Sequence, residues 1–153
     1  MQVDKAACFQ LVQSLWGGIH ERIQRLNTVH DKRRVLKQAH SQLMQELPLP
    51  SGSPNQQKAL EILRAQACIE LFCKRRIEKL KASALPDAQK QNLIADLALN
   101  LSQSQARLSA QWPVLTPEEE EILPLLLMRQ SLEEEFSMLW MQLKKEADRQ
   151  EIA

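Results

Sequence analysis

One apolar stripe constrains the fold of this chain more than any other feature of its sequence. It alternates steps of four and three residues from Cys8 to Leu47, and nine of its twelve positions are apolar: Cys8, Val12, Leu15, Ile19, Leu26, Val29, Leu36, Leu43 and Leu47. Such spacing places one continuous stripe along a helix, as in a coiled coil or a long bundle helix. We therefore expect a helix over residues 4–47, which would be about 65 Å long.

Two short segments weaken this first helix. Gly17-Gly18 lies in its first half, and each glycine costs about 1 kcal/mol relative to alanine in a helix. Asn27-Thr28 is a second weak point, because both residues are poor helix formers. We expect a bend at one of these places and not a complete break.

The rest of the chain divides into three further helices. The segment "LPLPSGSP" ends the first helix, and its prolines, glycine and serines predict a linker over residues 48–54. Apolar positions at helical spacing then predict helices over residues 55–84, 86–111 and 117–150. Thr116 with Glu119 forms a capping-box pattern at the start of the last helix.

The composition agrees with an all-α protein. Only 4% of the residues are aromatic, there is no Tyr, and there are three Gly, whereas strong helix formers such as Leu, Gln, Lys and Glu dominate. A chain of 153 residues fits one domain. We predict an all-α, extended four-helix bundle over residues 1–153, with a long coiled-coil-like first helix and a core that is completed by oligomerisation.

Charge is divided unevenly along the chain. Residues 1–115 contain 16 Lys and Arg against 9 Asp and Glu, whereas residues 116–153 contain 4 against 10. The two parts therefore carry net charges of +7 and −6. This division favours packing of the acidic last helix against basic helices, within one chain or between two chains.

The acidic segment "TPEEEEILPLLLMRQSLEEEF", residues 116–136, has three interpretations. Leu123–Leu127 matches the L-x-x-L-L pattern of helices that dock into a partner's groove, although the same leucines suit the protein's own core better. A membrane span is excluded, because the apolar run is far shorter than about 20 residues. Pro124 lies too deep for a first-turn proline, so it either kinks the helix or interrupts it.

The sequence contains no pattern typical of catalysis or metal binding. His20, His30 and His40 are ten residues apart and rotate around a helix, so they cannot bind one metal ion together. Cys8, Cys68 and Cys73 lack zinc-site spacing and suit reduced, structural thiols. We therefore expect no enzymatic activity, no cofactor, no metal site and no small-molecule substrate.

Two basic clusters leave nucleic-acid binding open as an alternative. They lie in residues 31–37 and 73–81, within predicted helices, and acidic residues interrupt both of them. Phosphate contacts would require their cations to share one face. The candidate contact residues are Lys32, Arg33, Arg34, Lys74, Arg75, Arg76 and Lys79.

The sequence thus predicts a non-enzymatic oligomerisation or protein-interaction module, as a region of a larger intracellular protein without a membrane segment. The expected partner is a second copy, with a homodimer as the simplest arrangement, or another helical protein. Apolar positions of the first and last helices are the candidate interface residues: Leu15, Ile19, Leu26, Leu36, Leu43, Leu126, Leu132, Phe136, Leu139 and Trp140.

Overall fold

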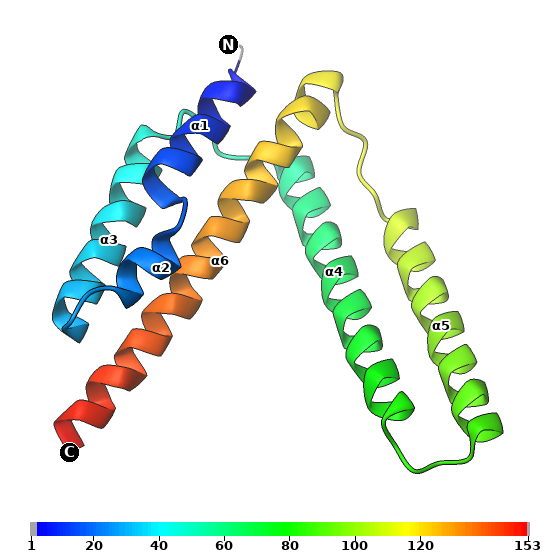
Figure 1. The fold of residues 1–153 in the computed structure, drawn as a ribbon. Helices are drawn as coiled ribbons and strands as arrows, with labels where there is room; N and C mark the ends of the chain where they lie inside the picture. Colours follow the sequence, from blue (N-terminus) through cyan, green and yellow to red (C-terminus); the bar gives the residue numbers. More distant parts are fainter. Residues whose placement is uncertain (1–2, 153) are drawn as a thin grey trace. The chain divides into compact units, whose positions relative to one another are not determined.

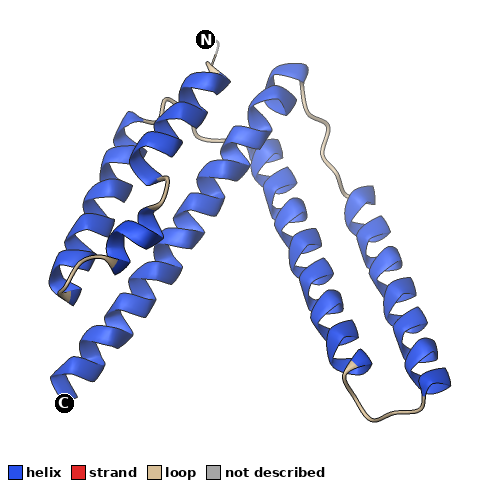
Figure 2. Cartoon of the chain, in the orientation of Figure 1, coloured by secondary structure: helices blue, strands red, loops and turns tan. Residues whose placement is uncertain are grey.

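The computed structural model describes residues 3–152 and confirms the all-α prediction (Figure 1). Over these residues every regular element is a helix, and loops join the helices (Figure 2). The bounds are α1 (Lys5–Trp16), α2 (Ile19–Gln24), α3 (Val29–Glu46), α4 (Pro54–Lys81), α5 (Asp87–Ala110) and α6 (Pro117–Ile152).

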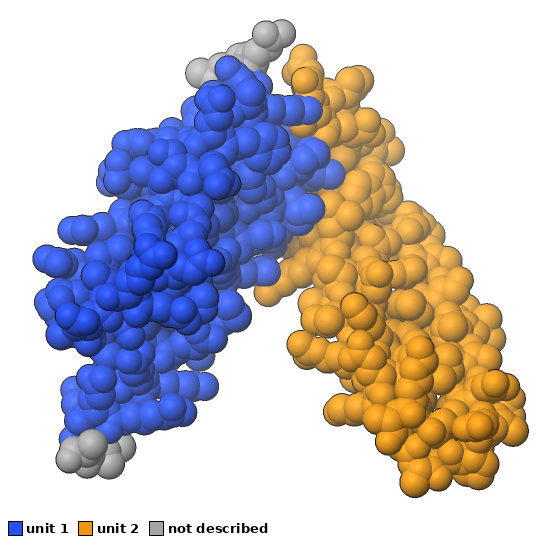
Figure 3. Space-filling view, in the orientation of Figure 1, with its two compact units in different colours: residues 1–51, 122–153 blue, residues 52–121 orange. Residues whose placement is uncertain are grey.

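The chain divides into two compact units, which are coloured separately in Figure 3. Unit 1 consists of residues 1–51 and 122–153, and unit 2 consists of residues 52–121. Unit 1 therefore contains α1, α2, α3 and most of α6, whereas unit 2 contains α4 and α5. The sequence predicted one helical domain over residues 1–153, and the contacts within the chain group its residues into these two units.

The structure corrects the continuous first helix that the sequence predicted over residues 4–47. That segment contains three helices, and the first break lies at the glycine pair. Gly18 has φ +68°, a left-handed conformation that side chains other than glycine rarely adopt. A Cβ atom on Gly17 would lie 2.4 Å from the carbonyl oxygen of Gln13. Both positions thus require glycine, and the pair breaks the helix instead of bending it.

The second break lies at the other weak point, before α3. Thr28 is the N-cap of α3, and its hydroxyl accepts a hydrogen bond of 3.1 Å from the amide of Asp31. Threonine is favoured at this position because its hydroxyl accepts a hydrogen bond from an otherwise unpaired amide of the first turn. The chain therefore stops one helix and starts another at Asn27-Thr28, and α3 returns alongside α1 (Figure 1).

Unit 1 has a continuous apolar core between α1, α2, α3 and α6. Leu36 and Leu43 of α3 are fully buried at its centre. The other buried members come from the remaining three helices: Trp16, Ile19, Ile23, Leu132, Leu139 and Leu143. The 4-3 stripe of residues 8–47 is thus covered within the chain, because the folded-back α3 and the apolar face of α6 pack against it.

Unit 2 is a helical hairpin with a thinner core. Helix α4 begins with a capping box between Ser53 and Gln56, and five residues connect it to the antiparallel α5. The two helices are in contact along their length, and the Cys73 thiol lies 3.7 Å from the carbonyl oxygen of Leu97. Two helices alone cover only one side of each other, so the hairpin leaves apolar positions open.

Helix α6 is uninterrupted from Pro117 to Ile152, with Pro124 inside it. Its start has the predicted capping box: the Thr116 hydroxyl accepts from the Glu119 amide, and the Glu119 carboxylate accepts from the Thr116 amide, both at 3.1 Å. The hydroxyl of Ser53 also donates to Glu119. These hydrogen bonds lower the pKa of the Glu119 carboxyl, and the one from Ser53 has the largest effect.

Candidate interaction surfaces

The predicted interface residues lie mainly in the core of unit 1. Leu36, Leu43, Ile19, Leu126, Leu132 and Leu139 are buried. Leu15, Leu26, Phe136 and Trp140 are half-buried, and all of these except Leu26 pack against the core of unit 1. These ten side chains therefore do not form one open surface.

A row of stacked side chains from α3 and α6 lies in unit 1. The Arg33 guanidinium lies 4.6 Å from the ring centre of Trp140, and Trp140 stacks on Phe136 at 5.8 Å. Phe136 in turn stacks on the imidazole of His40, with 4.0 Å between ring centres and 13° between ring planes. Cation–π and aromatic contacts of this kind add about 0.5–1.5 kcal/mol each beyond area burial.

His40 lies at the end of this row and also meets Trp16 of α1 edge-on, at 6.2 Å. Its Nε2 atom is buried and has no hydrogen-bond partner among the described residues. Burial lowers the pKa of His40, and the nearby carboxylate of Glu133 opposes this shift. The imidazole is therefore held in its neutral form, as a packing group between two helices.

Three basic residues of α3 are each engaged by a different neighbour. Lys32 forms an ion pair of 3.4 Å with Glu146 of α6, and Arg34 forms one of 3.4 Å with Asp31. Arg33 lies on Trp140, as described above. Of the first predicted nucleic-acid cluster, Lys32 and Arg33 are thus engaged with α6, whereas Arg34 and Lys37 remain exposed.

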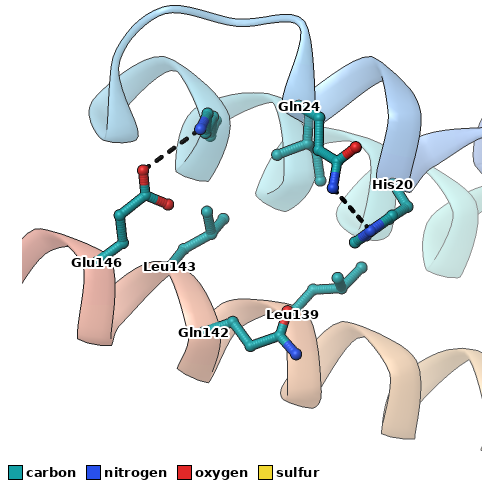
Figure 4. A pocket seen from close by; sticks show the side chains of 8 residues that line it. His20, Gln24, Leu139, Gln142, Leu143 and Glu146 are labelled. Atoms are coloured by element: carbon teal, nitrogen blue, oxygen red, sulfur yellow. Dashed lines mark hydrogen bonds and ion pairs between the residues drawn. The ribbon is translucent and has the colours of Figure 1, made fainter.

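A small hollow of about 180 Å³ lies between α2, α3 and α6 in unit 1 (Figure 4). The Lys32–Glu146 ion pair borders it, and Gln24 donates a 3.0 Å hydrogen bond to His20 on another side. Leu139 and Leu143 contribute its apolar wall. Its charged groups already neutralise each other, so the hollow has no free charge with which to select a ligand.

The cysteines and the described acidic residues do not form a reactive or metal-binding group. All three cysteines are free, and only Cys68 is exposed. Burial, followed by the Asp4 carboxylate, raises the pKa of the Cys8 thiol, which keeps it protonated. Within residues 3–152 no three His, Cys, Asp or Glu side chains are placed to hold a metal ion. No helix in this range is long and apolar enough to cross a bilayer.

Large apolar side chains are exposed on both helices of the hairpin of unit 2, as they are on unit 1 at Phe9, Met138 and Met141. No residue of α5 is buried, although this helix contains several leucines. Leu99 of α5 is 58% exposed, and Leu71 and Phe72 of α4 are 48% and 65% exposed. A contiguous exposed apolar patch, unlike a single exposed leucine, marks an interaction surface.

The second predicted basic cluster also lies on the hairpin, near the end of α4. Lys74, Arg75, Arg76 and Lys79 are all exposed, whereas Lys32 and Arg33 of α3 are half-buried. Arg76 and Lys79 follow Phe72 by four and seven residues, so the three side chains share one side of the helix. This side of α4 thus combines an aromatic ring with cations.

An open groove of about 170 Å³ lies between α4 and α5 on the hairpin. Its apolar lining comes from both helices, namely Leu80, Leu93 and Leu97. Its polar lining consists of Arg76 on α4 and of Asp96 and Asn100 on α5. The groove is therefore an apolar strip with a cation on one helix and a carboxylate on the other.

The spacing of apolar residues in the sequence did not predict this groove or the exposure of Leu99. The signal was nevertheless present: Leu71 and Phe72 are adjacent, so they point about 100° apart and cannot both face α5. Asp96 is likewise visible in the sequence as a carboxylate between Leu93 and Leu97.

No protein-family model matches this chain, and neither the curated proteins nor the solved structures contain a significant match to it. The function is therefore inferred from the geometry of the chain itself.

Proposed function

We propose that this chain is a non-enzymatic helical protein-interaction module. In this proposal unit 1 is a bundle that completes its own core, and the α4–α5 hairpin carries the interaction surface. The observation that supports it most strongly is the absence of any buried residue in α5, a described helix of 24 residues. Most helical stability comes from packing an apolar face, so a helix without buried residues needs further cover.

The contrast between the two units supports this assignment. In unit 1 the apolar stripe of α3 is fully covered, with Leu36 and Leu43 at 0% exposure. In unit 2 the large side chains of Phe72 and Leu99 remain mostly open. Burying apolar surface contributes about 25 cal/mol per Å², so a partner that covers the hairpin would gain several kcal/mol. An intracellular setting is part of the proposal, because all three thiols are free.

A matched pair of phenylalanine variants tests this proposal. Phe72 of the hairpin and Phe9 of α1 are exposed to similar extents, 65% and 50%. The tagged full chain is used as bait, and the amount of bound protein, including untagged copies of the chain, is measured. We expect Phe72→Gln to reduce binding by about tenfold, as for an interface hot spot, and Phe9→Gln to leave it unchanged. Equal binding by both variants and the wild type would remove the hairpin as the interaction surface.

Nucleic-acid contact through α4 is the second candidate. It is favoured by the four exposed cations near the end of α4 and by the aromatic ring of Phe72 on the same side. Lys32 and Arg33 of α3 do not contribute to it, because they are engaged with α6 within unit 1. Binding of single-stranded RNA should then weaken steeply with salt, and Lys74→Gln with Arg75→Gln should reduce the salt slope by about two.

A further inference from the structure

The groove of the hairpin has opposite charges on its two sides. Arg76 of α4 and Asp96 of α5 line the same groove and are both exposed. No hydrogen bond or ion pair joins them within the described chain, and neither side chain has another polar partner there. Each charge is therefore available to a group of opposite sign from outside the chain.

The apolar strip between these charges is incompletely covered. Leu93 remains 37% exposed, and Leu80 and Leu97 are only half-buried. On α4, Phe72 lies one turn before Arg76 and extends the apolar surface along the same side. A helix that lies in this groove would cover the leucines and Phe72 together.

We propose that the occupant is the hairpin of a second copy of this chain. The two hairpins pack face to face, α4 of each against α5 of the other, and form an antiparallel four-helix bundle. A two-fold axis parallel to the hairpins relates the copies. This inference rests on the proposed function, and it specifies both the partner and the register of that interaction surface.

The charge pattern selects a second copy over another protein. A two-fold axis along the hairpin keeps both tips at the same end, so Arg76 of one copy meets Asp96 of the other at the same level. The same rotation forms the reciprocal pair. An unrelated helix would need an acidic group and a basic group at matching positions, whereas this chain already has both.

Charge reversal at these two residues gives a direct test with the purified full chain. The mass is measured by light scattering at about 5 and 100 µM, a range that brackets a micromolar dissociation constant. We expect dimers from the wild type at the higher concentration. Arg76→Glu and Asp96→Arg alone should each raise the dimer dissociation constant at least about tenfold, because both reciprocal contacts then join like charges.

Mixing the two variants is the decisive step. In a mixed dimer, one contact pairs the reversed residues and the other pairs the original residues, so both are favourable. The mixture should therefore recover the wild-type mass, and a tagged Arg76→Glu chain should retain untagged Asp96→Arg chain. Arg75→Glu is the matched control: it makes the same charge change one residue away, outside the groove lining, and should leave the dimer intact.

The outcomes separate this inference from the proposed function. A wild-type monomer at both concentrations, or a dimer that Arg76→Glu leaves unchanged, would overturn the hairpin–hairpin dimer. If binding of other proteins or of RNA still depended on Phe72, the hairpin would remain the interaction surface with a different partner. If that binding were also insensitive to Phe72→Gln, the proposed function would fail as well. Recovery of the dimer on mixing Arg76→Glu with Asp96→Arg excludes loss of folding in either variant as the cause.

Discussion

His40 is the residue whose environment links the stability of unit 1 to pH. It stacks on Phe136, meets Trp16 edge-on and keeps Nε2 buried without a hydrogen-bond partner in the described chain. The sequence placed His40 on the apolar stripe, but its stacking partners could not be predicted, because they depend on how α6 packs against α3. A side chain so enclosed acts as an aromatic core residue only while it is neutral.

We expect the stability of unit 1 to fall as the pH falls below about 6.5. The pKa of His40 is lower in the folded chain than in the unfolded chain, where histidine titrates near 6.5. Protonation therefore favours unfolding, and the stabilisation is complete above that pH and is lost as the pH falls through the folded-state pKa. Denaturant unfolding at pH 7.5 and 5.5, followed by tryptophan fluorescence, measures the difference.

The matched variants for this prediction are His40→Gln and His20→Gln. The first should flatten the pH dependence of the unfolding free energy. The second should leave it unchanged, because His20 is exposed on α2 and hydrogen-bonds to Gln24. An unchanged slope in His40→Gln would show that another group controls the acid sensitivity of unit 1.

At the scale of the elements, the sequence predicted the starts and ends of helices better than their continuity. The helices predicted over 55–84, 86–111 and 117–150 occupy Pro54–Lys81, Asp87–Ala110 and Pro117–Ile152. Proline, serine and threonine caps define these ends locally, so spacing and caps suffice to place them. The predicted bend at Gly17-Gly18 is a complete break, because the left-handed φ of Gly18 and the crowding at Gly17 follow from the backbone path.

The glycine pair provides a test of this break. Gly18→Ala should lower the unfolding free energy by about 1 kcal/mol, because alanine resists the left-handed conformation. Gly18→Asn is the control and should cost less, since asparagine adopts this conformation more readily. Thermal and urea unfolding measure both variants. A neutral or stabilising Gly18→Ala would mean that residues 5–24 can form one straight helix in solution.

Pro124 should weaken α6 at the point where it lies. The helix continues through it, so the carbonyl of Glu120 loses its usual i→i+4 hydrogen bond to the missing N–H. We expect Pro124→Ala to raise the unfolding free energy by about 1–3 kcal/mol. Pro117→Ala is the matched control and should change it little, because the N–H of a first-turn residue has no partner in the helix. Denaturant unfolding compares the two, and equal effects would contradict this account of Pro124.

At the scale of the whole molecule, the two units differ in how completely each buries its own apolar side chains. The sequence identified the apolar stripe of residues 8–47 and expected a second chain to cover it. The chain folds back at two places, and side chains of α3 and α6 pack against most of that stripe. Uncovered apolar side chains remain on the hairpin, where Phe72 and Leu99 are exposed, and on unit 1, where Phe9, Met138 and Met141 are exposed. Their location depends on tertiary packing that spacing alone cannot give.

Substitution of a leucine by alanine should therefore change the unfolding free energy by different amounts in the two units. Leu43→Ala removes a fully buried side chain from unit 1 and should cost about 2–5 kcal/mol of unfolding free energy. Leu99→Ala, at a position 58% exposed on α5, should leave the unfolding free energy within about 0.5 kcal/mol of the wild type. Urea unfolding of both variants checks this, and a large cost for Leu99→Ala would show that unit 2 already buries its apolar surface.

The central claim is that the α4–α5 hairpin depends on a partner, whereas unit 1 does not. Native-state hydrogen exchange of the full chain, measured at several protein concentrations, tests it most directly. The account predicts weak protection of the α5 amides at low concentration, protection that rises with concentration, and strong, concentration-independent protection of the α3 amides around Leu36 and Leu43. Protection of α5 equal to that of α3 at the lowest concentration would contradict it.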